Sequence, residues 1–179
     1  MIITTKAVKK APNKAEIKNL YLAAFPKEER LPWWLLRFWG VCRRGNLTAY
    51  YDGKIFCGFT FTVTEADAFY VMFLAVDSKV REQGYGSAIL EYLKQANPGK
   101  TIFLAVEPLG EAAPNNDQRI KRMAFYKKNG FSDTGFNIRE VGGVFRMLSS
   151  TEKIDADACQ RVFLKLSCGF WKPKITKIS

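Results

Sequence analysis

Apolar residues recur along the chain at two spacings, one typical of helices and one typical of strands, and breaker residues separate the runs. A first strand is expected over residues 2–8. A helix is expected over 12–26, where Asn13 is the N-cap and Glu16 follows three residues later. A second, tryptophan-rich helix is expected over 28–44. The chain therefore begins with a strand and two helices.

The segment after these helices is rich in β-branched and aromatic residues. Asp52-Gly53 separates two such runs and is the strongest short hairpin signal in the sequence. The expected strands cover 47–52, 54–65, 68–77, 101–107, 131–140 and 144–150, and the expected helices cover 84–97, 117–130 and 155–168. Because a strand, a helix and a further strand follow one another in the middle, we expect a β-α-β crossover. The fold class is thus α/β, with a mixed sheet and flanking helices.

A length of 179 residues suits one domain, and no linker divides the chain. We expect a single domain over 1–179, with an N-terminal helical pair at about 13–44 and a C-terminal helix and basic tail at about 151–179. The N-terminus lacks the apolar segment of a signal peptide, and the apolar blocks are too short to cross a membrane. These features predict a cytoplasmic protein with no membrane partner.

Cysteine and histidine usage limits the possible chemistry. The four cysteines show no CxxC or Cys/His spacing, so we expect reduced thiols that fill the core and no metal site. The sequence contains no histidine, which excludes Ser-His-Asp and Cys-His machinery. Any proton transfer near neutral pH must therefore use a carboxylate, Tyr, Cys, Lys or ordered water.

The net charge of +11 has three interpretations. It is typical of a soluble basic surface, of a nucleic-acid-binding surface, or of a pocket for a strongly anionic small molecule. The sequence contains no RNP, helix-turn-helix or zinc-finger motif, which disfavours nucleic acid as a partner.

The stretch "VREQGYGSAILEYLKQ", residues 80–95, bears on the third interpretation. It follows an expected strand and opens a helix, and a helix N-terminus carries free N–H groups with a partial charge of roughly +0.5. Gly84 and Gly86 have no side chain to block an oxyanion, and Arg81 and Ser87 can reach the same anion. The alternative is that the two glycines only permit a tight turn. The stretch is neither a Walker loop nor a complete dinucleotide fingerprint.

The segment "AVDSKVREQGYGSAIL" resembles the acyl-CoA signature of the GNAT N-acetyltransferases, and "AFYKKNGF", about forty residues later, resembles their second block. The resemblance extends from about residue 15 to 150, and "AFPKEERLPWW" is similar to an uncharacterised bacterial subgroup. It implies a mostly antiparallel central sheet with one parallel crossover, acetyl-CoA as donor, and an amine-bearing acceptor. Direct attack by the amine would pass through a tetrahedral intermediate.

The resemblance also implies roles for individual residues. Residues 81–87 would hold the CoA diphosphate, largely through backbone amides, and residues 74–76 would pair with pantetheine like an added strand. A bulge there would separate this strand from 101–107 and admit the thioester, and the Val76 amide would donate to the thioester oxygen. The implied cofactor-binding residues are Leu74, Ala75, Val76, Arg81, Glu82, Gln83, Gly84, Tyr85, Gly86 and Ser87.

Acetyl transfer requires a base and an acid. Only a neutral amine attacks, and an alkylammonium with a pKa of about 10.4 is almost fully protonated at pH 7. Glu107, at the end of an expected strand, is the first candidate base; Glu28, Glu29 and water are alternatives, and Glu107 can equally pair with a nearby arginine. Tyr126 occupies the family's general-acid position and would protonate the leaving thiolate; its alternative is a buried aromatic residue.

Asn116 and the tryptophan-rich segment each have two interpretations. Many relatives carry an Asn where this chain has Arg119, so Asn116 either contacts the cofactor or caps its helix. The tryptophan-rich segment at 33–39 is expected to be a core helix, with an aromatic wall of the acceptor pocket as the alternative. Exposed edge strands would allow a homodimer.

Three functions are therefore compared. The first is an N-acetyltransferase that transfers acetyl to a primary amine. The second is an acyl-CoA-binding sensor with little turnover, and the third is a basic nucleic-acid binder. The sequence does not predict the identity of the acceptor, because its pocket is built from variable loops and the N-terminal helices.

Overall fold

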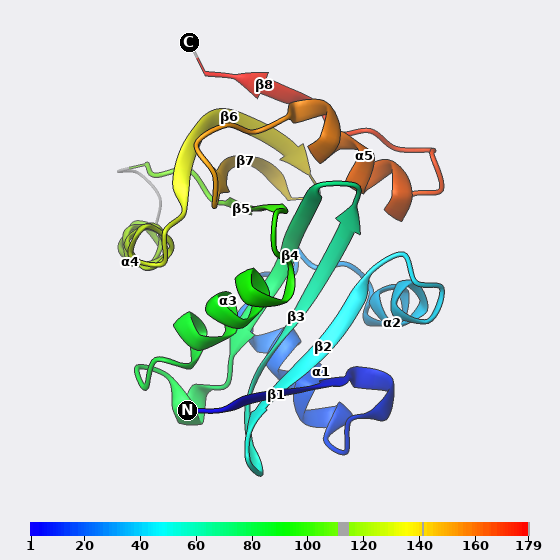
Figure 1. The fold of residues 1–179 in the computed structure, drawn as a ribbon, viewed down its shortest axis with the longest axis vertical. Helices are drawn as coiled ribbons and strands as arrows, with labels where there is room; N and C mark the ends of the chain where they lie inside the picture. Colours follow the sequence, from blue (N-terminus) through cyan, green and yellow to red (C-terminus); the bar gives the residue numbers. More distant parts are fainter. Residues whose placement is uncertain (111–114, 141, 179) are drawn as a thin grey trace. The chain divides into compact units, whose positions relative to one another are not determined.

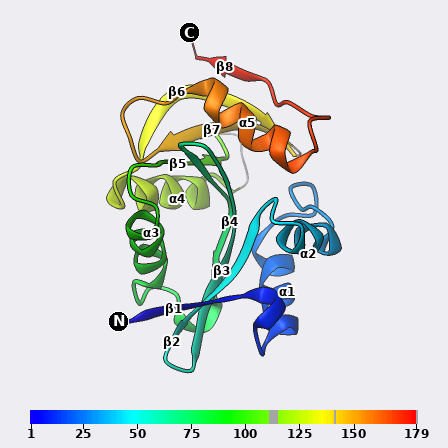
Figure 2. The same cartoon turned by 45° about the vertical axis from the view of Figure 1, so that its right-hand side comes forward.

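The computed structural model describes residues 1–110, 115–140 and 142–178. The chain forms two compact units. Unit 1 comprises Met1–Val63 and Val71–Pro98, and unit 2 comprises Thr64–Tyr70 and Gly99–Ser179. Strand β4 (Ala68–Val76) contributes residues to both units. Figures 1 and 2 show the elements of each unit.

Unit 1 is a sheet with the strand order β1-β2-β3-β4 and helices on both faces. Figure 2 shows α3 on one face and α1 with α2 on the other. Besides β4, its elements are β1 (Ile3–Ala7), η1 (Val8–Lys10), α1 (Lys14–Ala24), α2 (Trp33–Val41), β2 (Asn46–Asp52), β3 (Ile55–Glu65), η2 (Ser78–Val80) and α3 (Tyr85–Ala96). The two 3-10 turns, η1 and η2, were not expected from the sequence.

The β2–β3 hairpin confirms the signal at Asp52-Gly53. Asp52 pairs with Ile55, and Gly53 in the two-residue turn has φ 58°. Positive φ is what the favoured hairpin turns require at this position, and glycine adopts it without a Cβ clash. The pairing shifts by one residue between Tyr50 and Tyr51. The hairpin therefore sets the register between β2 and β3.

Tyr21 holds α1 and the following turn against the sheet in unit 1. Its ring is fully buried, with its centroid 5.2 Å from that of Phe73 and 6.1 Å from that of Phe59. Its hydroxyl donates to the Leu31 carbonyl at 2.8 Å and accepts from the Leu31 N–H at 2.8 Å. Burial raises the pKa of Tyr21 to about 12, so this hydroxyl stays protonated. The turn between α1 and α2 is thus tied to the core.

Helix α3 is fixed by an apolar face and by one aromatic contact. Ile89, Leu90 and Leu93 recur at helical spacing and are buried. On the same side, the Tyr92 ring lies edge-on to Tyr50 with 5.9 Å between centroids, and its hydroxyl lies 3.3 Å from the Thr5 hydroxyl. This packing holds α3 against β1 and β2.

Unit 2 has the strand order β4-β5-β7-β6-β8, to which β4 contributes its first residues. Its core includes the buried rings of Phe103, Phe131 and Phe163. Its other elements are β5 (Thr101–Val106), α4 (Asn116–Lys128), β6 (Ser132–Glu140), β7 (Gly143–Ser149), α5 (Ala156–Leu166) and β8 (Ile175–Lys177). The last strand was missed in the sequence because three residues are too few for a periodic pattern.

The expected fold class is confirmed: strands and helices form an α/β fold with a mixed, mostly antiparallel sheet and a β4-α3-β5 connection. The segment between the strand expected at 101–107 and the helix expected at 117–130 lies partly outside the described residues, because 111–114 are not described. Among the helices the structure describes, none is long and apolar enough to cross a membrane.

Two sequence expectations need correction. Cys57 and Cys159 are buried, but Cys42 and Cys168 are exposed, so only half of the cysteines fill the core; all four are free thiols. Helix α2 is shorter than expected and has only one buried residue, Leu36. Pro32 directly precedes the helix. Proline disfavours helical geometry in the residue before it, so the helix cannot begin earlier and starts at Trp33.

Candidate functional site

The glycine-rich turn connects β4 to α3 in unit 1. Asp77 begins it by accepting the Lys79 N–H at 2.9 Å, and residues 81–83 are exposed. Gly84 is the N-cap of α3 and is left-handed, with φ 87° and ψ −1°. A residue with a Cβ is strained in this conformation, so glycine is required here for the backbone to turn into the helix.

This turn presents the free N–H groups of the first turn of α3. The predicted binding residues Arg81, Glu82 and Gln83 lie exposed before the helix, and Ser87 is half-buried within its first turn. Any Cβ at Gly84 would meet only the end of the Met1 side chain, at 3.9 Å, so the space beside this residue is nearly open. Free amides, open space and flanking Arg81 suit an anion such as a diphosphate. The interpretation as a diphosphate site stays a prediction.

Tyr85 has a side-chain partner of its own in this turn. Its hydroxyl donates to Asp52 Oδ2 at 3.2 Å, on the β2–β3 hairpin, and its side chain is buried together with Gly86. The Tyr85 ring therefore anchors the turn to the sheet. If Tyr85 binds the cofactor, it does so through its backbone amide. The sequence analysis predicted backbone amides as the main contacts of residues 81–87.

The end of β4 carries the three residues predicted to pair with pantetheine. Ala75 is buried, whereas Leu74 and Val76 are partly exposed. A Cβ at Gly58 on β3 would lie 2.2 Å from the Ala75 carbonyl oxygen, so only glycine permits this close approach. The Asp77 N–H also donates to the Cys57 carbonyl at 2.9 Å. Sequence analysis missed Gly58, although an isolated glycine inside a strand signals such an approach.

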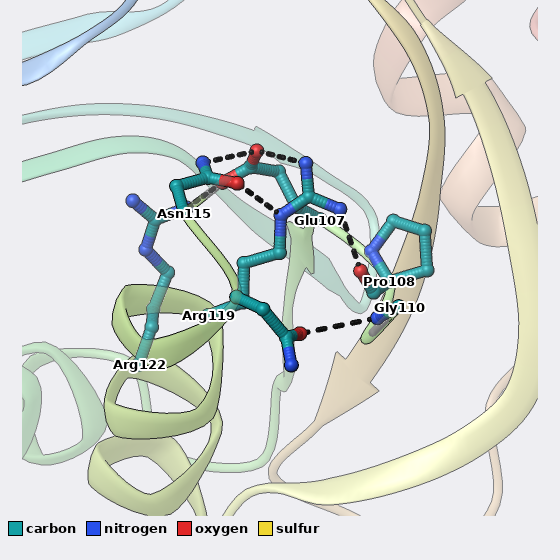
Figure 3. A network of polar contacts seen from close by, with 7 residues as sticks. Glu107, Pro108, Gly110, Asn115, Arg119 and Arg122 are labelled. Carbon is teal, nitrogen blue, oxygen red and sulfur yellow. Dashed lines mark hydrogen bonds and ion pairs between the residues drawn. The ribbon is translucent and has the colours of Figure 1, made fainter. Parts of the chain in front are cut away.

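Glu107 lies directly after β5 in unit 2, at the centre of a polar network (Figure 3). Its Oε1 lies 2.9 Å from Arg119 Nη2, and its Oε2 accepts from Arg122 Nη1 at 2.7 Å. Asn115 Nδ2 donates to Oε1 at 3.0 Å. Arg119 also donates to the carbonyl of Pro108 and to Asn115 Oδ1, both at 2.8 Å. Both carboxylate oxygens are therefore occupied.

These contacts change the interpretation of Glu107. Burial by itself would raise the pKa of Glu107, but the Asn115 hydrogen bond and the charges of Arg122 and Arg119 outweigh it and lower the pKa. A carboxylate with a lowered pKa is a weak proton acceptor. The sequence analysis gave two interpretations of Glu107, a general base or a partner of a nearby arginine. The structure shows the pairing with arginine. Glu107 thus connects β5 to the start of α4.

Asn116 begins α4, and its side-chain Oδ1 accepts from the Gly110 N–H at 3.2 Å. This contact ties the helix start to the loop after β5. Asn116 therefore has a structural contact other than the helix cap that the sequence offered as the alternative, and the predicted cofactor contact stays a prediction. Neither Asn115 nor any other side chain caps the first turn of α4 in the described part of this region.

Tyr126 lies on α4 and is buried, with 9% of its surface exposed. Its ring packs edge-on to Phe125 and Phe131, with 5.2 and 5.9 Å between centroids. Burial raises the pKa of Tyr126 to about 12, so the hydroxyl keeps its proton at neutral pH and is able to donate it. This state suits a general acid, and the assignment of that role to Tyr126 stays a prediction.

Tyr70, which is buried, and Glu140, which is partly exposed, form a hydrogen-bonded pair in unit 2 that sequence analysis missed. The Tyr70 hydroxyl donates to Glu140 Oε1 at 2.6 Å. Burial raises the pKa of Glu140 to about 7, against a smaller lowering effect of this hydrogen bond. Nothing in the sequence pattern signals the pair, because its members lie on β4 and β6, far apart along the chain.

The other two candidate bases lie in unit 1, between α1 and α2. Glu28 is exposed and Glu29 is half-buried in the turn at residues 27–29. Their roles stay predictions. Among the residues that the structure describes, no group of three or more Cys, Asp or Glu side chains is placed to hold a metal ion.

Helix α2 presents aromatic residues to an open groove rather than to the core. Trp34, Phe38 and Val41 are 68%, 53% and 62% exposed. The groove has a volume of about 360 Å³ and is lined by η1, α2 and the start of β2. Lys9 and Arg37 add positive charge to its wall. The expectation of a core helix is therefore wrong for this face of α2, while an aromatic wall of a pocket is what the helix provides.

The glycine turn between β4 and α3 and the buried tyrosine of α4 both lie within the segment that a family comparison matches. The acetyltransferase (GNAT) domain family matches residues 41–133, just over half of the chain. This protein belongs to the GNAT acetyltransferase family. The match includes both segments on which the resemblance was based. No curated protein sequence matches the chain.

Solved structures share the fold of this GNAT protein. A GNAT-family acetyltransferase from Bacteroides thetaiotaomicron superposes with a TM-score of 0.73 at 18% identity, covering 96% of this chain and 100% of that one. The aminoglycoside 6'-N-acetyltransferase from Enterococcus faecium gives 0.59 at 18% identity, covering 87% and 99%. A GNAT-family acetyltransferase from Elizabethkingia anophelis with acetyl-CoA bound gives 0.55 at 18% identity, covering 83% and 95%. At these identities the likeness is one of fold.

Proposed function

We propose that this GNAT protein is a cytoplasmic N-acetyltransferase that transfers the acetyl group of acetyl-CoA to a primary amine. The observation that carries the proposal is the left-handed Gly84, which begins α3 with its first-turn amides beside open space. The Elizabethkingia anophelis relative holds acetyl-CoA on the same fold, which supports acetyl-CoA as the donor.

The proposed reaction assigns roles to backbone amides and to individual side chains. In unit 1, the amides of residues 84–87 and the Arg81 side chain bind the diphosphate, and the backbone of Leu74–Val76 pairs with pantetheine. The Val76 N–H donates to the thioester oxygen as the tetrahedral intermediate forms. In unit 2, Tyr126 donates its proton to the sulfur as the C–S bond breaks.

The acceptor is proposed as an amine because a neutral nitrogen attacks a thioester without needing a metal. The Enterococcus faecium relative is an aminoglycoside 6'-N-acetyltransferase, which makes a polyamine-like antibiotic one reasonable probe among several. The acceptor class is to be found by experiment.

Two measurements test the proposal. Isothermal titration calorimetry with acetyl-CoA tests donor binding, and a thiol-release assay tests transfer to kanamycin, spermidine, free amino acids and lysine peptides. Binding with thiol release supports the enzyme. Binding without release by any of these amines supports the sensor instead.

The same protein samples also test the nucleic-acid-binding function. If that function is correct, the affinity for DNA or RNA falls steeply with salt and does not change when acetyl-CoA is added. Part of the net charge of +11 is accounted for by the phosphates of the proposed donor. The nucleic-acid function is therefore the weakest of the three.

A further inference from the structure

Helix α2 has two faces, and its outer face carries apolar side chains that the sheet does not cover. Leu36 is the buried residue of the inner face. Trp34, Phe38 and Val41 follow one another at spacings of four and three residues, so they form one stripe along the helix. All three side chains are more than half exposed. Large apolar side chains that gather on one surface mark a binding site, whereas scattered ones do not.

The stripe forms one wall of the groove beside α2 (the α2 groove). Residues 7–9 and 46–48 form the remaining walls, and all lining residues lie within Met1–Val63 of unit 1. Val8 and Leu47 are buried, with 3% and 6% of their surfaces exposed, and give the groove an apolar floor. Its volume of about 360 Å³ lies within the range of about 300–1,000 Å³ that is typical of small-molecule sites.

The charge of the α2 groove is positive. Lys9 and Arg37 are its charged lining residues, and within the described part of the chain no aspartate or glutamate lines it. Neither cation forms an ion pair with any described residue. A ligand that neutralises them must be an anion, and the planar guanidinium of Arg37 can hold a carboxylate through two parallel hydrogen bonds.

Two other occupants suit the α2 groove less well. A second copy of this chain would bring a net charge of +11 against +11 and place like charges in contact. A membrane surface is flat, whereas the apolar floor of the groove is recessed between α2, η1 and β2. Charge complementarity and the concave shape therefore favour a small anion with an apolar body.

The α2 groove lies away from the residues predicted to hold the thioester. It contacts β2, and β3 separates β2 from β4 in the sheet order. Residues 46–48 pair with 60–62, whereas Gly58 is the β3 residue that lies against Ala75. Neighbouring strands lie about 4.8 Å apart, so β2 and β4 are separated by about 10 Å across the sheet. A small ligand in the groove therefore does not reach the thioester.

We propose that the α2 groove binds a small aromatic carboxylate at a site separate from that of acetyl-CoA. The aromatic body packs against the rings of Trp34 and Phe38, which favour offset or edge-on partners. The carboxylate pairs with Arg37 and Lys9 at the wall of the groove. The inference does not depend on acetyl transfer, because it is based on α2, η1 and β2 alone.

Calorimetry tests the charge of the ligand with two matched probes, 2-naphthylacetate and its neutral amide, 2-naphthylacetamide. We expect the carboxylate to bind one to one and at least about tenfold more tightly than the amide, because hydrogen bonds to charged groups are the stronger ones. The preference should shrink as salt rises. Equal affinity for the two probes would overturn the inference.

Arg37→Gln is expected to lower the affinity for 2-naphthylacetate at least about tenfold and to leave the affinity for the amide nearly unchanged. Arg37→Lys keeps the charge but loses the planar fork, so an intermediate affinity is expected. Lys18→Gln, which removes an exposed charge from α1 outside the groove, is the matched control. Carboxylate affinity that stays the same in Arg37→Gln would overturn the inference.

Trp34→Ala is expected to weaken the binding of both probes, because it removes part of the aromatic wall. Leu22→Ala, which truncates an exposed apolar residue of α1 outside the groove, is its control. Both residues are exposed, so the two variants should unfold at nearly the wild-type temperature. Unchanged binding of both probes by Trp34→Ala would place them elsewhere on the protein and overturn the inference.

Acetyl-CoA distinguishes the α2 groove from the donor site. The affinity for 2-naphthylacetate is expected to be the same with and without saturating acetyl-CoA, and Gly84→Val should bind the carboxylate like the wild type. Displacement of the carboxylate by acetyl-CoA would place it in the donor site and overturn the inference. If acetyl-CoA itself does not bind, the proposed acetyl transfer fails, while the carboxylate measurements still decide the inference.

Two results would assign the groove to another occupant and overturn the inference. In the first, 2-naphthylacetate does not bind, but phosphatidylglycerol vesicles bind the wild type and not Arg37→Gln or Trp34→Ala. In the second, the carboxylate again does not bind, and sedimentation velocity shows a wild-type dimer that the same variants dissociate. The groove would then be a membrane contact or an interface between two copies.

Discussion

Glu107 accepts a hydrogen bond from Arg122 over 2.7 Å, and this contact spans from the end of β5 to the second turn of α4. The side chain of Glu107 is only 11% exposed, and Arg119 occupies its other oxygen at 2.9 Å. A carboxylate in this position connects two elements of unit 2. Its contribution to stability should therefore be larger than its contribution to proton transfer.

Glu107→Gln is expected to lower the free energy of unfolding by about 1–3 kcal/mol, because hydrogen bonds to charged groups are lost and two arginines remain. The folded pKa of Glu107 is lowered, so its stabilisation is present above the unfolded pKa of about 4.3 and is lost as the pH falls through the folded value. Urea unfolding at pH 7 and pH 3 checks this: the difference between wild type and variant should shrink at pH 3. Loss of turnover in a well-folded variant would instead return Glu107 to the list of bases.

Gly84→Val is expected to weaken acetyl-CoA binding at least tenfold, which corresponds to about 1.4 kcal/mol. Valine is strained at φ 87° and would distort the first turn of α3. Calorimetry with acetyl-CoA measures the effect. Gly110→Ala is a suitable control, because Gly110 has no atom of the described chain within 4 Å of its added Cβ. Equal affinity in wild type and Gly84→Val would remove the glycine turn from the binding site.

Gly58→Ala is expected to destabilise unit 1 by about 1–3 kcal/mol, as overpacking of a tight contact does. The added Cβ would lie 2.2 Å from a backbone oxygen of Ala75, so one of the two strands must move. Thermal unfolding measures the loss. Because Leu74–Val76 would shift with the strand, acetyl-CoA affinity should fall as well. A variant as stable as the wild type would contradict the close approach.

Tyr126→Phe is expected to lower kcat by about 10²-fold or more while acetyl-CoA affinity stays nearly unchanged, because only the proton donor is removed. The pKa of about 12 implies that the wild-type hydroxyl stays protonated up to pH 10, so no loss of this acid is expected below that pH. Initial-rate kinetics between pH 6 and 10 provide the measurement. Full activity of the variant would assign the acid to water.

Glu140→Gln is expected to be more stable than the wild type at pH 8, by up to about 3 kcal/mol. The folded pKa of Glu140 is raised to about 7, so between the unfolded value of about 4.3 and pH 7 the unfolded chain ionises first. Wild-type stability therefore falls across this interval relative to the variant. Below pH 4 both states are neutral, and the two proteins should unfold at nearly the same urea concentration. If the difference in stability between wild type and variant is the same at pH 4 and pH 8, the raised pKa of Glu140 is contradicted.

The sequence by itself determined the elements, because helices, hairpins and turns depend on local chemistry. The spacing of Ile89, Leu90 and Leu93 predicted α3, and Asp52-Gly53 predicted the β2–β3 hairpin. Gly84 was identified because it lacks a side chain at a turn from a strand into a helix, which the sequence shows directly; its left-handed conformation came from the structure. The family followed from two local motifs for the same reason.

The tertiary structure alone decided which charged groups are neutralised and which are isolated. Sequence patterns do not show that Arg119 and Arg122 face Glu107, or that Tyr70 hydrogen-bonds Glu140, since these contacts join different elements. They also do not show that Trp34 and Phe38 of α2 point outward, because a short apolar helix has no polar face to indicate its exposed side. Burial and partner charge act through space, and these two quantities set the pKa of each carboxyl group and hence its chemistry.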